Sequence, residues 1–117
     1  MILNIVQRKI EPDIVVVQMS GRITMGSDSQ KIEWGLAELL KQNLKKIIFD
    51  LTDVSYLDSS GVGILTMCHA RLRKADGSLR LVGAQRMVEE VLAITSVNKI
   101  VPVCRTTAEA AEDFHRL

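Results

Sequence analysis

Aromatic residues are scarce in this chain, where Trp, Tyr and Phe together make up 3% of the 117 residues. Proteins that bind single-stranded nucleic acid stack the bases on aromatic side chains, and one Trp and one Tyr cannot supply such a surface. An excess of charge is also lacking, because the formal net charge is +1 and the cations and anions are interspersed. Affinity for a phosphate backbone depends on clustered Lys and Arg. We therefore expect no direct contact with nucleic acid.

Cysteine and long apolar runs are equally limited. The two cysteines, Cys68 and Cys104, are far apart and match no metal or redox spacing. We expect both to be buried free thiols in a reducing compartment. No apolar run approaches the roughly 18 residues of a membrane span, and the N-terminus has no signal-peptide pattern. These absences predict a cytoplasmic protein without membrane insertion.

Aliphatic residues are abundant, and the hydrophobic fraction is 47%. A chain of 117 residues with this composition can bury a core of its own. No linker, repeat or low-complexity segment interrupts it. We expect one domain over residues 1–117.

Strands and helices alternate along most of the sequence. Apolar and β-branched runs predict strands at residues 2–8, 14–20, 47–51, 79–82 and 100–101. Helical spacing and capping signals predict helices from about Ser27, from about Ser60, over 87–92 and after Thr106. Residues 22–27 and 52–58 are predicted loops, the second with Val54 and Leu57 pointing inward. The order ββαβαβαβα predicts an α/β fold with a five-stranded, mostly parallel sheet, an initial hairpin and about four helices.

Two capping boxes are predicted, Ser27 with Gln30 and Thr106 with Glu109. In the last helix, Ala108, Ala111 and Phe114 are expected to share the buried face. Pro102 confines the last strand to a terminal or edge position, because proline cannot donate to a sheet ladder.

A carboxylate and two hydroxyls, Asp58-Ser59-Ser60, stand where the third strand gives way to the second helix. Two interpretations are compatible with this segment. It can be a simple N-cap, since Asp and Ser oxygens accept hydrogen bonds from the first helical N–H groups. It can also be a place that accepts added negative charge beside the positive end of a helix dipole. Gly61 and Gly63 weaken a helix start, and we expect them to leave the serines accessible to a partner or a kinase.

No catalytic constellation is evident. The chain lacks a Gly-x-Ser-x-Gly elbow, a phosphate-binding Gly-x-x-x-x-Gly-Lys loop and a complete dinucleotide fingerprint. His69 and His115 have no second ligand at metal spacing. Asp50 and Asp53 lie where open α/β folds place ligands, but turn chemistry accounts for them equally well. We expect no catalytic site, no metal and no cofactor.

Two segments resemble the signature of STAS domains, and in particular of bacterial anti-sigma factor antagonists. Residues 49–54 (Phe-Asp-Leu-Thr-Asp-Val) match the end of the family's central strand, and residues 58–61 (Asp-Ser-Ser-Gly) match its most specific block. The 79–83 strand and the 88–92 helix agree in spacing, so the resemblance covers the whole chain. One departure is Gly21-Arg22-Ile23-Thr24, where members often have Gly-Glu-Leu-Asp.

The resemblance implies partner switching. Ser59 would be phosphorylated by an anti-sigma factor that is also a serine kinase, and a serine phosphatase would reset it. The unphosphorylated protein would bind that anti-sigma factor and release the sigma factor. The implied partner-binding residues are Asp58, Ser59, Ser60, Gly61, Thr24 and Gly26.

Two other functions stay open at this point. STAS domains also serve as soluble accessory subunits of membrane transporters, and a helix start beside Asp58 can hold a nucleotide or another small phosphate ligand. The oligomeric state, the controlled sigma factor and any substitution of Ser60 for Ser59 are not specified by the sequence.

Overall fold

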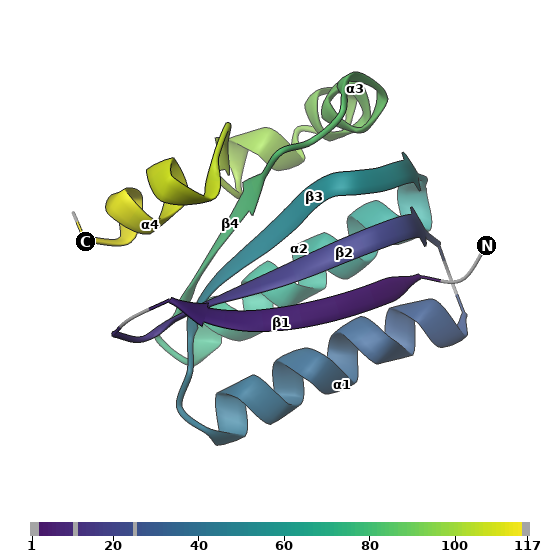
Figure 1. The fold of residues 1–117 in the computed structure, drawn as a ribbon. Helices are drawn as coiled ribbons and strands as arrows, with labels where there is room; N and C mark the ends of the chain where they lie inside the picture. Colours follow the sequence, from purple (N-terminus) through teal and green to yellow (C-terminus); the bar gives the residue numbers. More distant parts are fainter. Residues whose placement is uncertain (1–2, 11, 25, 116–117) are drawn as a thin grey trace.

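The computed structural model describes residues 3–10, 12–24 and 26–115. Figure 1 shows a twisted sheet with helices on both sides. The elements are β1 (Asn4–Ile10), β2 (Ile14–Ile23), α1 (Ser27–Lys41), β3 (Lys46–Leu57), α2 (Ser59–Lys74), β4 (Ser78–Val82), α3 (Arg86–Ile94), the 3₁₀ turn η1 (Val97–Lys99), β5 (Val103–Cys104) and α4 (Thr107–His115). This order confirms the α/β class and the predicted succession of strands and helices.

The sheet has five strands in the order β1-β2-β3-β4-β5. β1 and β2 form the predicted antiparallel hairpin, with Ile10 opposite Ile14. The pairs β2–β3, β3–β4 and β4–β5 are parallel. The nearly continuous apolar run of β3 is explained by its central position, because a parallel strand covered on both faces has no side that meets water.

Two apolar layers hold the helices on the sheet. The larger one joins the sheet to α1, α2 and α3, and its helical members include Leu36, Leu65 and Leu92. The smaller one joins the other face of the sheet to α4, where Ala110 and Phe114 are buried. The expected inward face of α4 is therefore correct for Phe114 and wrong for Ala108, which is exposed.

β2 and β3 are longer than predicted. The predicted loop at 52–58 is wrong as far as Leu57, because β3 continues to that residue. The loop predicted at 22–27 is wrong for its first two residues, because β2 continues to Ile23, which pairs with Leu57. Val54 and Leu57 do point inward, as expected, and are 0% and 2% exposed. The pairing resumes after register shifts at Gln18/Ser20 and Gly21/Arg22, which a period-two pattern does not reveal.

Three smaller predictions also need correction. The last strand lies after Pro102 instead of before it, although its edge position is confirmed. The N-cap of α1 is Gly26 and not Ser27, and it makes no side-chain capping bond. Cys104 is half-buried, whereas Cys68 is buried as expected. Half of the second capping box is present, because the Glu109 N–H donates to Thr106 Oγ1 at 3.1 Å.

None of the helices in the described ranges combines the length and the apolar character that crossing a bilayer requires.

Candidate functional site

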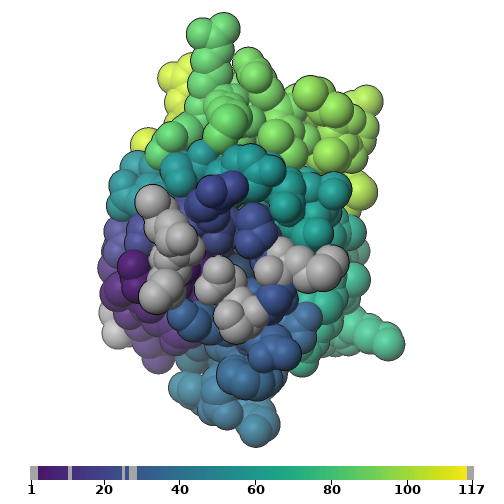
Figure 2. All heavy atoms as spheres, turned by 90° about the vertical axis from the view of Figure 1, so that its right-hand side faces the viewer, coloured from purple at the N-terminus to yellow at the C-terminus, as the bar shows by residue number. Residues whose placement is uncertain are grey.

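The candidate site lies where β2 and β3 end and α2 begins. We call this region, residues 22–24 and 56–61, the serine end. Figure 2 looks onto it from the right-hand side of Figure 1, with β2 in dark blue beside β3 in teal and α3 in green above them. Parallel strands bring their carboxyl ends to one edge of the sheet, so segments far apart in the sequence meet here.

Asp58 is the N-cap of α2. Its backbone is extended, its Oδ1 accepts a hydrogen bond from the Gly61 N–H at 3.0 Å, and its carbonyl oxygen accepts from the Val62 N–H at 2.9 Å. The carboxylate thus satisfies one of the N–H groups that a helix leaves unpaired at its start. The capping interpretation of Asp58 is correct.

Ser59 is the first residue of α2, and its side chain is exposed. Its hydroxyl makes no side-chain hydrogen bond to any residue that the structure describes. The first turn of the helix carries no acidic residue, so the partial positive charge of its N–H groups is offset only by the cap. Added negative charge at Ser59 would be stabilised by these N–H groups.

Ser60 is half-buried and differs from Ser59 in its surroundings. Together with Ser29, Glu33, Gly63, Ile64 and Met67, it lines an open groove of about 230 Å³ between α1 and α2. The groove therefore begins one residue beyond Ser59, and it combines an apolar floor with one carboxylate.

The two glycines of the turn have different roles. Gly61 is buried, and a β-carbon there would collide with the carbonyl oxygen of Ile23 and with Leu57 Cδ1. The expectation that Gly61 gives access to the serines is wrong, because it lets α2 pack against the end of β2 and offers no surface to a partner. Gly63 is exposed, with no neighbouring atom within 4 Å of an added β-carbon, so that position is open.

Thr24 and Gly26 come from the segment that follows β2. Thr24 is half-buried directly after Ile23, and Gly26 is exposed with φ 115°. The carbonyl oxygen of Ile23, the residue before Thr24, lies beside Gly61 at the start of α2. A role of Thr24 and Gly26 in partner binding stays a prediction.

One pair at the serine end was not anticipated from the sequence. The guanidinium carbon of Arg22 lies 4.3 Å from the centroid of the Tyr56 ring. Both residues fell in predicted loops, whereas in the structure they face each other across paired β2 and β3. No local pattern could have revealed this pair, since it depends on the extended register.

The carboxylates Asp50 and Asp53 belong to β3. Asp50 Oδ1 accepts from the Thr52 N–H at 3.0 Å and from Thr52 Oγ1 at 2.6 Å, which supports its expected local role. Within the described residues, no three His, Cys, Asp or Glu side chains are arranged to hold a metal ion.

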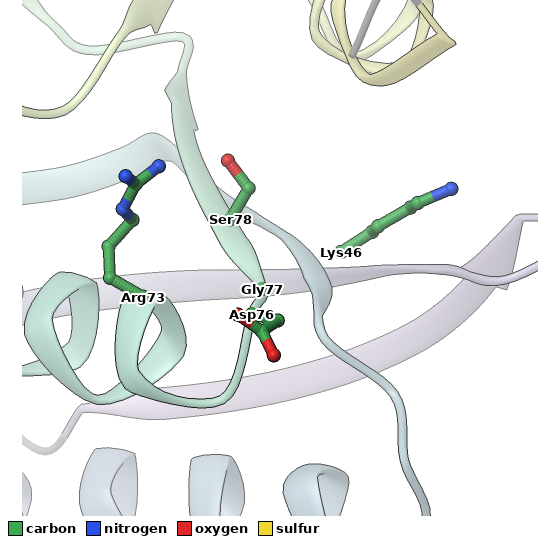
Figure 3. Close-up of a pocket in the computed structure, with 5 residues that line it drawn as sticks. All are labelled: Lys46, Arg73, Asp76, Gly77 and Ser78. Carbon is green, nitrogen blue, oxygen red and sulfur yellow. The ribbon is translucent and has the colours of Figure 1, made fainter.

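Another cavity lies at the opposite end of the sheet. It has a volume of about 280 Å³ and is lined by Lys46, Arg73, Asp76, Gly77 and Ser78. Figure 3 shows the charged groups of Lys46 and Arg73 on opposite sides of Ser78. Lys46 is also paired with Asp13 at 3.1 Å. Because these cations do not converge, we do not assign a ligand site here.

Burial shifts the pKa values of two titratable groups elsewhere on α2. Burial raises the pKa of the Cys68 thiol to about 12, so this thiol stays protonated at neutral pH. Burial lowers the pKa of His69, and the nearby guanidinium groups of Arg73 and Arg80 lower it further. Neither residue is part of the serine end.

Comparison with known proteins now identifies the family, because the model of the STAS domain matches residues 6–110. This chain belongs to the STAS family. A Thermotoga maritima protein named "Putative anti-sigma factor antagonist" is 28% identical over 108 residues, which cover 92% of this chain and 96% of that protein. A crystal structure with the same description, also from T. maritima, has a TM-score of 0.85 at 25% identity and covers 93% of this chain and 92% of the other.

The anti-sigma factor antagonist SpoIIAA in its unphosphorylated form has the same fold, with a TM-score of 0.72 at 20% identity over 97% of this chain and 98% of SpoIIAA. The phosphorylated form of this Bacillus protein gives a TM-score of 0.72 at 19% identity, over 95% and 99% of the two chains. The STAS chain described here is thus similar to anti-sigma factor antagonists along nearly its whole length.

Proposed function

We propose that this protein is an anti-sigma factor antagonist whose binding is switched by phosphorylation of Ser59. Its partner is an anti-sigma factor that is also a serine kinase. The observation that carries the proposal is the exposed Ser59 hydroxyl, which has no side-chain partner among the described residues and stands on the first residue of α2. The role would be exercised in the cytoplasm by one domain over residues 1–117.

For the phosphoryl transfer, this chain supplies only the Ser59 hydroxyl. The Ser59 oxygen attacks the γ-phosphorus of ATP held by the kinase, its proton passes to a base of the kinase, and ADP leaves. A serine phosphatase reverses the state by hydrolysing the phosphoester to the free hydroxyl and inorganic phosphate. Ser59 is favoured over Ser60 because it is more exposed.

The added phosphate can be tolerated by the fold and still oppose binding. It carries about −1.5 to −2 charges at neutral pH, and the N–H groups of the first turn of α2 can stabilise them. The phosphate also stands next to the half-buried Asp58 carboxylate, on a surface that must lose water when a partner docks. A coupling of about 1–3 kcal/mol would change the affinity about 5- to 150-fold.

The similar proteins support this assignment. The T. maritima relative is named as an anti-sigma factor antagonist, and SpoIIAA has been solved in an unphosphorylated and a phosphorylated form. We assign a binding role and not a catalytic one because the neighbouring Asp58 carboxylate is engaged as the helix cap and no histidine of the described residues stands beside Ser59. His69, the histidine on the same helix, lies roughly 15 Å further along α2.

Incubation with the kinase-type anti-sigma factor and ATP, followed by phosphopeptide mass spectrometry, tests the proposal. We expect one phosphate on Ser59, none on the Ser59→Ala variant and full incorporation into the matched Ser60→Ala variant. Phosphate on Ser60, or none on the wild-type chain, would contradict it.

A further inference from the structure

A second feature of the serine end concerns the choice of partner. Arg22 is an exposed residue near the end of β2, and its guanidinium group lies over the half-buried ring of Tyr56 on β3. The two residues are register partners in the parallel β2–β3 pair. The strand pairing therefore places the two residues side by side, with the guanidinium group lying over the Tyr56 ring.

The stacked guanidinium keeps its hydrogen-bonding capacity. Among the described residues, Arg22 forms no ion pair and donates no side-chain hydrogen bond. A guanidinium over a ring face is attracted by the π-system, and its N–H groups lie in its own plane. These in-plane groups match the two oxygens of a carboxylate in a bidentate pair.

The pair adjoins the site of Ser59. Ile23, the residue after Arg22, touches the first turn of α2 through its carbonyl oxygen at the Gly61 position. Leu57, the residue after Tyr56, ends β3 one residue before the Asp58 cap. Ile23 and Leu57 are buried, so Arg22 points to the opposite face of the strand, at the same end of the sheet as Ser59. A partner large enough to cover this end of the sheet would reach both residues.

The charges around Arg22 restrict what can dock there. Asp53 is exposed, and Asp58 is half-buried at the start of α2. Either carboxylate would repel a negative group on a partner, whereas the guanidinium of Arg22, unpaired among the described residues, would attract it. Charge complementarity at this end of the sheet therefore favours a partner that brings an acidic side chain to Arg22.

We propose that Arg22, held on Tyr56, is a specificity-determining residue that receives an Asp or Glu carboxylate of the anti-sigma factor. This inference rests on the proposed function, because it takes the anti-sigma factor as the occupant of the serine end. Complementary charges of this kind govern partner choice and association rate.

The test measures binding of the purified kinase-type anti-sigma factor by calorimetry. All variants carry Ser59→Ala, so that phosphorylation cannot contribute. We expect Arg22→Glu to weaken binding about 10- to 100-fold, as for an interfacial Arg anchor. Arg8→Glu is the matched control, since it makes the same charge change at an exposed site on β1, and we expect its affinity to stay within about twofold of the parent.

The second arm is a charge swap. Each surface Asp and Glu of the anti-sigma factor is changed to Lys, and we expect one such variant to recover most of the affinity for Arg22→Glu and to bind the parent less tightly. Unchanged binding of Arg22→Glu, or a loss that no acidic-to-lysine variant repairs, would overturn the assignment of a carboxylate to Arg22. If the Ser59→Ala parent itself does not bind, the proposed function fails, and this inference fails with it.

Discussion

Asp58 accepts a hydrogen bond from the backbone N–H of Gly61 at 3.0 Å, so the residue before the phosphorylation candidate is also the cap of its helix. Removal of the carboxylate in Asp58→Ala should lower the free energy of unfolding by about 1 kcal/mol. Asp58→Asn should retain most of the stability, because Asn caps about as well as Asp. Urea denaturation of the three proteins checks this, and equal losses for Ala and Asn would show that charge and not capping is the source.

Gly61 and Gly63 form a matched pair for testing the packing of α2. Gly61→Ala places a methyl group against the Ile23 carbonyl oxygen and should destabilise the protein by about 1–3 kcal/mol. Gly63→Ala meets no atom within 4 Å and should stabilise it by up to about 1 kcal/mol through helix propensity. Midpoints of urea unfolding give both values. A neutral Gly61→Ala would mean that α2 does not pack on β2 as described.

Arg80 and Asp113 join the C-terminal helix to β4. Arg80 is 6% exposed, its Nε donates to the Asp113 carboxylate, and its guanidinium carbon lies 4.8 Å from the Phe114 ring centroid. Asp113→Ala leaves this buried cation without its carboxylate and should cost about 1–3 kcal/mol, less than a fully buried pair because Asp113 is partly exposed. Glu38→Ala, which breaks the exposed pair with Lys41, should cost under about 0.5 kcal/mol. Equal losses in thermal unfolding would contradict a structural role for Arg80–Asp113.

The lowered pKa of His69 should make the protein less stable as the pH falls. The folded state lowers the pKa of His69, so the unfolded chain takes up a proton more readily. Well above the ordinary histidine pKa of about 6.5, the imidazole is neutral in both states. As the pH falls from there through the lowered folded-state value, the unfolded state is favoured.

The His69→Gln variant should therefore lose less stability than wild type between about pH 7.5 and 5.5. His115→Gln, at an exposed position on α4, is the control. Urea midpoints at the two pH values provide the comparison, and identical pH dependence of His69→Gln and wild type would refute the effect.

The sequence was sufficient to predict the order of the strands and helices and the topology of the sheet. Long β-branched runs separated by helical spacing lead to a hairpin followed by parallel crossovers, and the sheet has that order. It did not reveal how far β2 and β3 extend, because Thr52, Asp53 and Ser55 have the composition of a loop. The strand conformation of this segment depends on the pairing of Asp53, Val54, Tyr56 and Leu57 with residues 20–23, which is a long-range contact.

The same distinction applies to the candidate site. The cap at Asp58 could be predicted because capping is local, and the Gly61 N–H that it accepts from lies three residues away. The role of Ser59 rests on the family resemblance and stays a prediction. The reason for Gly61 was missed, since its close neighbour Ile23 lies far away in the sequence. Arg22 and Tyr56 were missed for the same reason, as only the register of β2 on β3 brings them together.

The central claim is that the charge on Ser59 decides binding, and calorimetric titration of the kinase-type anti-sigma factor with Ser59→Ala and Ser59→Asp tests it most directly. We predict that Ser59→Ala binds like the unphosphorylated wild type, whereas Ser59→Asp keeps its fold and binds at least about 5-fold more weakly. If Ser59→Asp binds as tightly as wild type, phosphorylation at this serine does not control the partner.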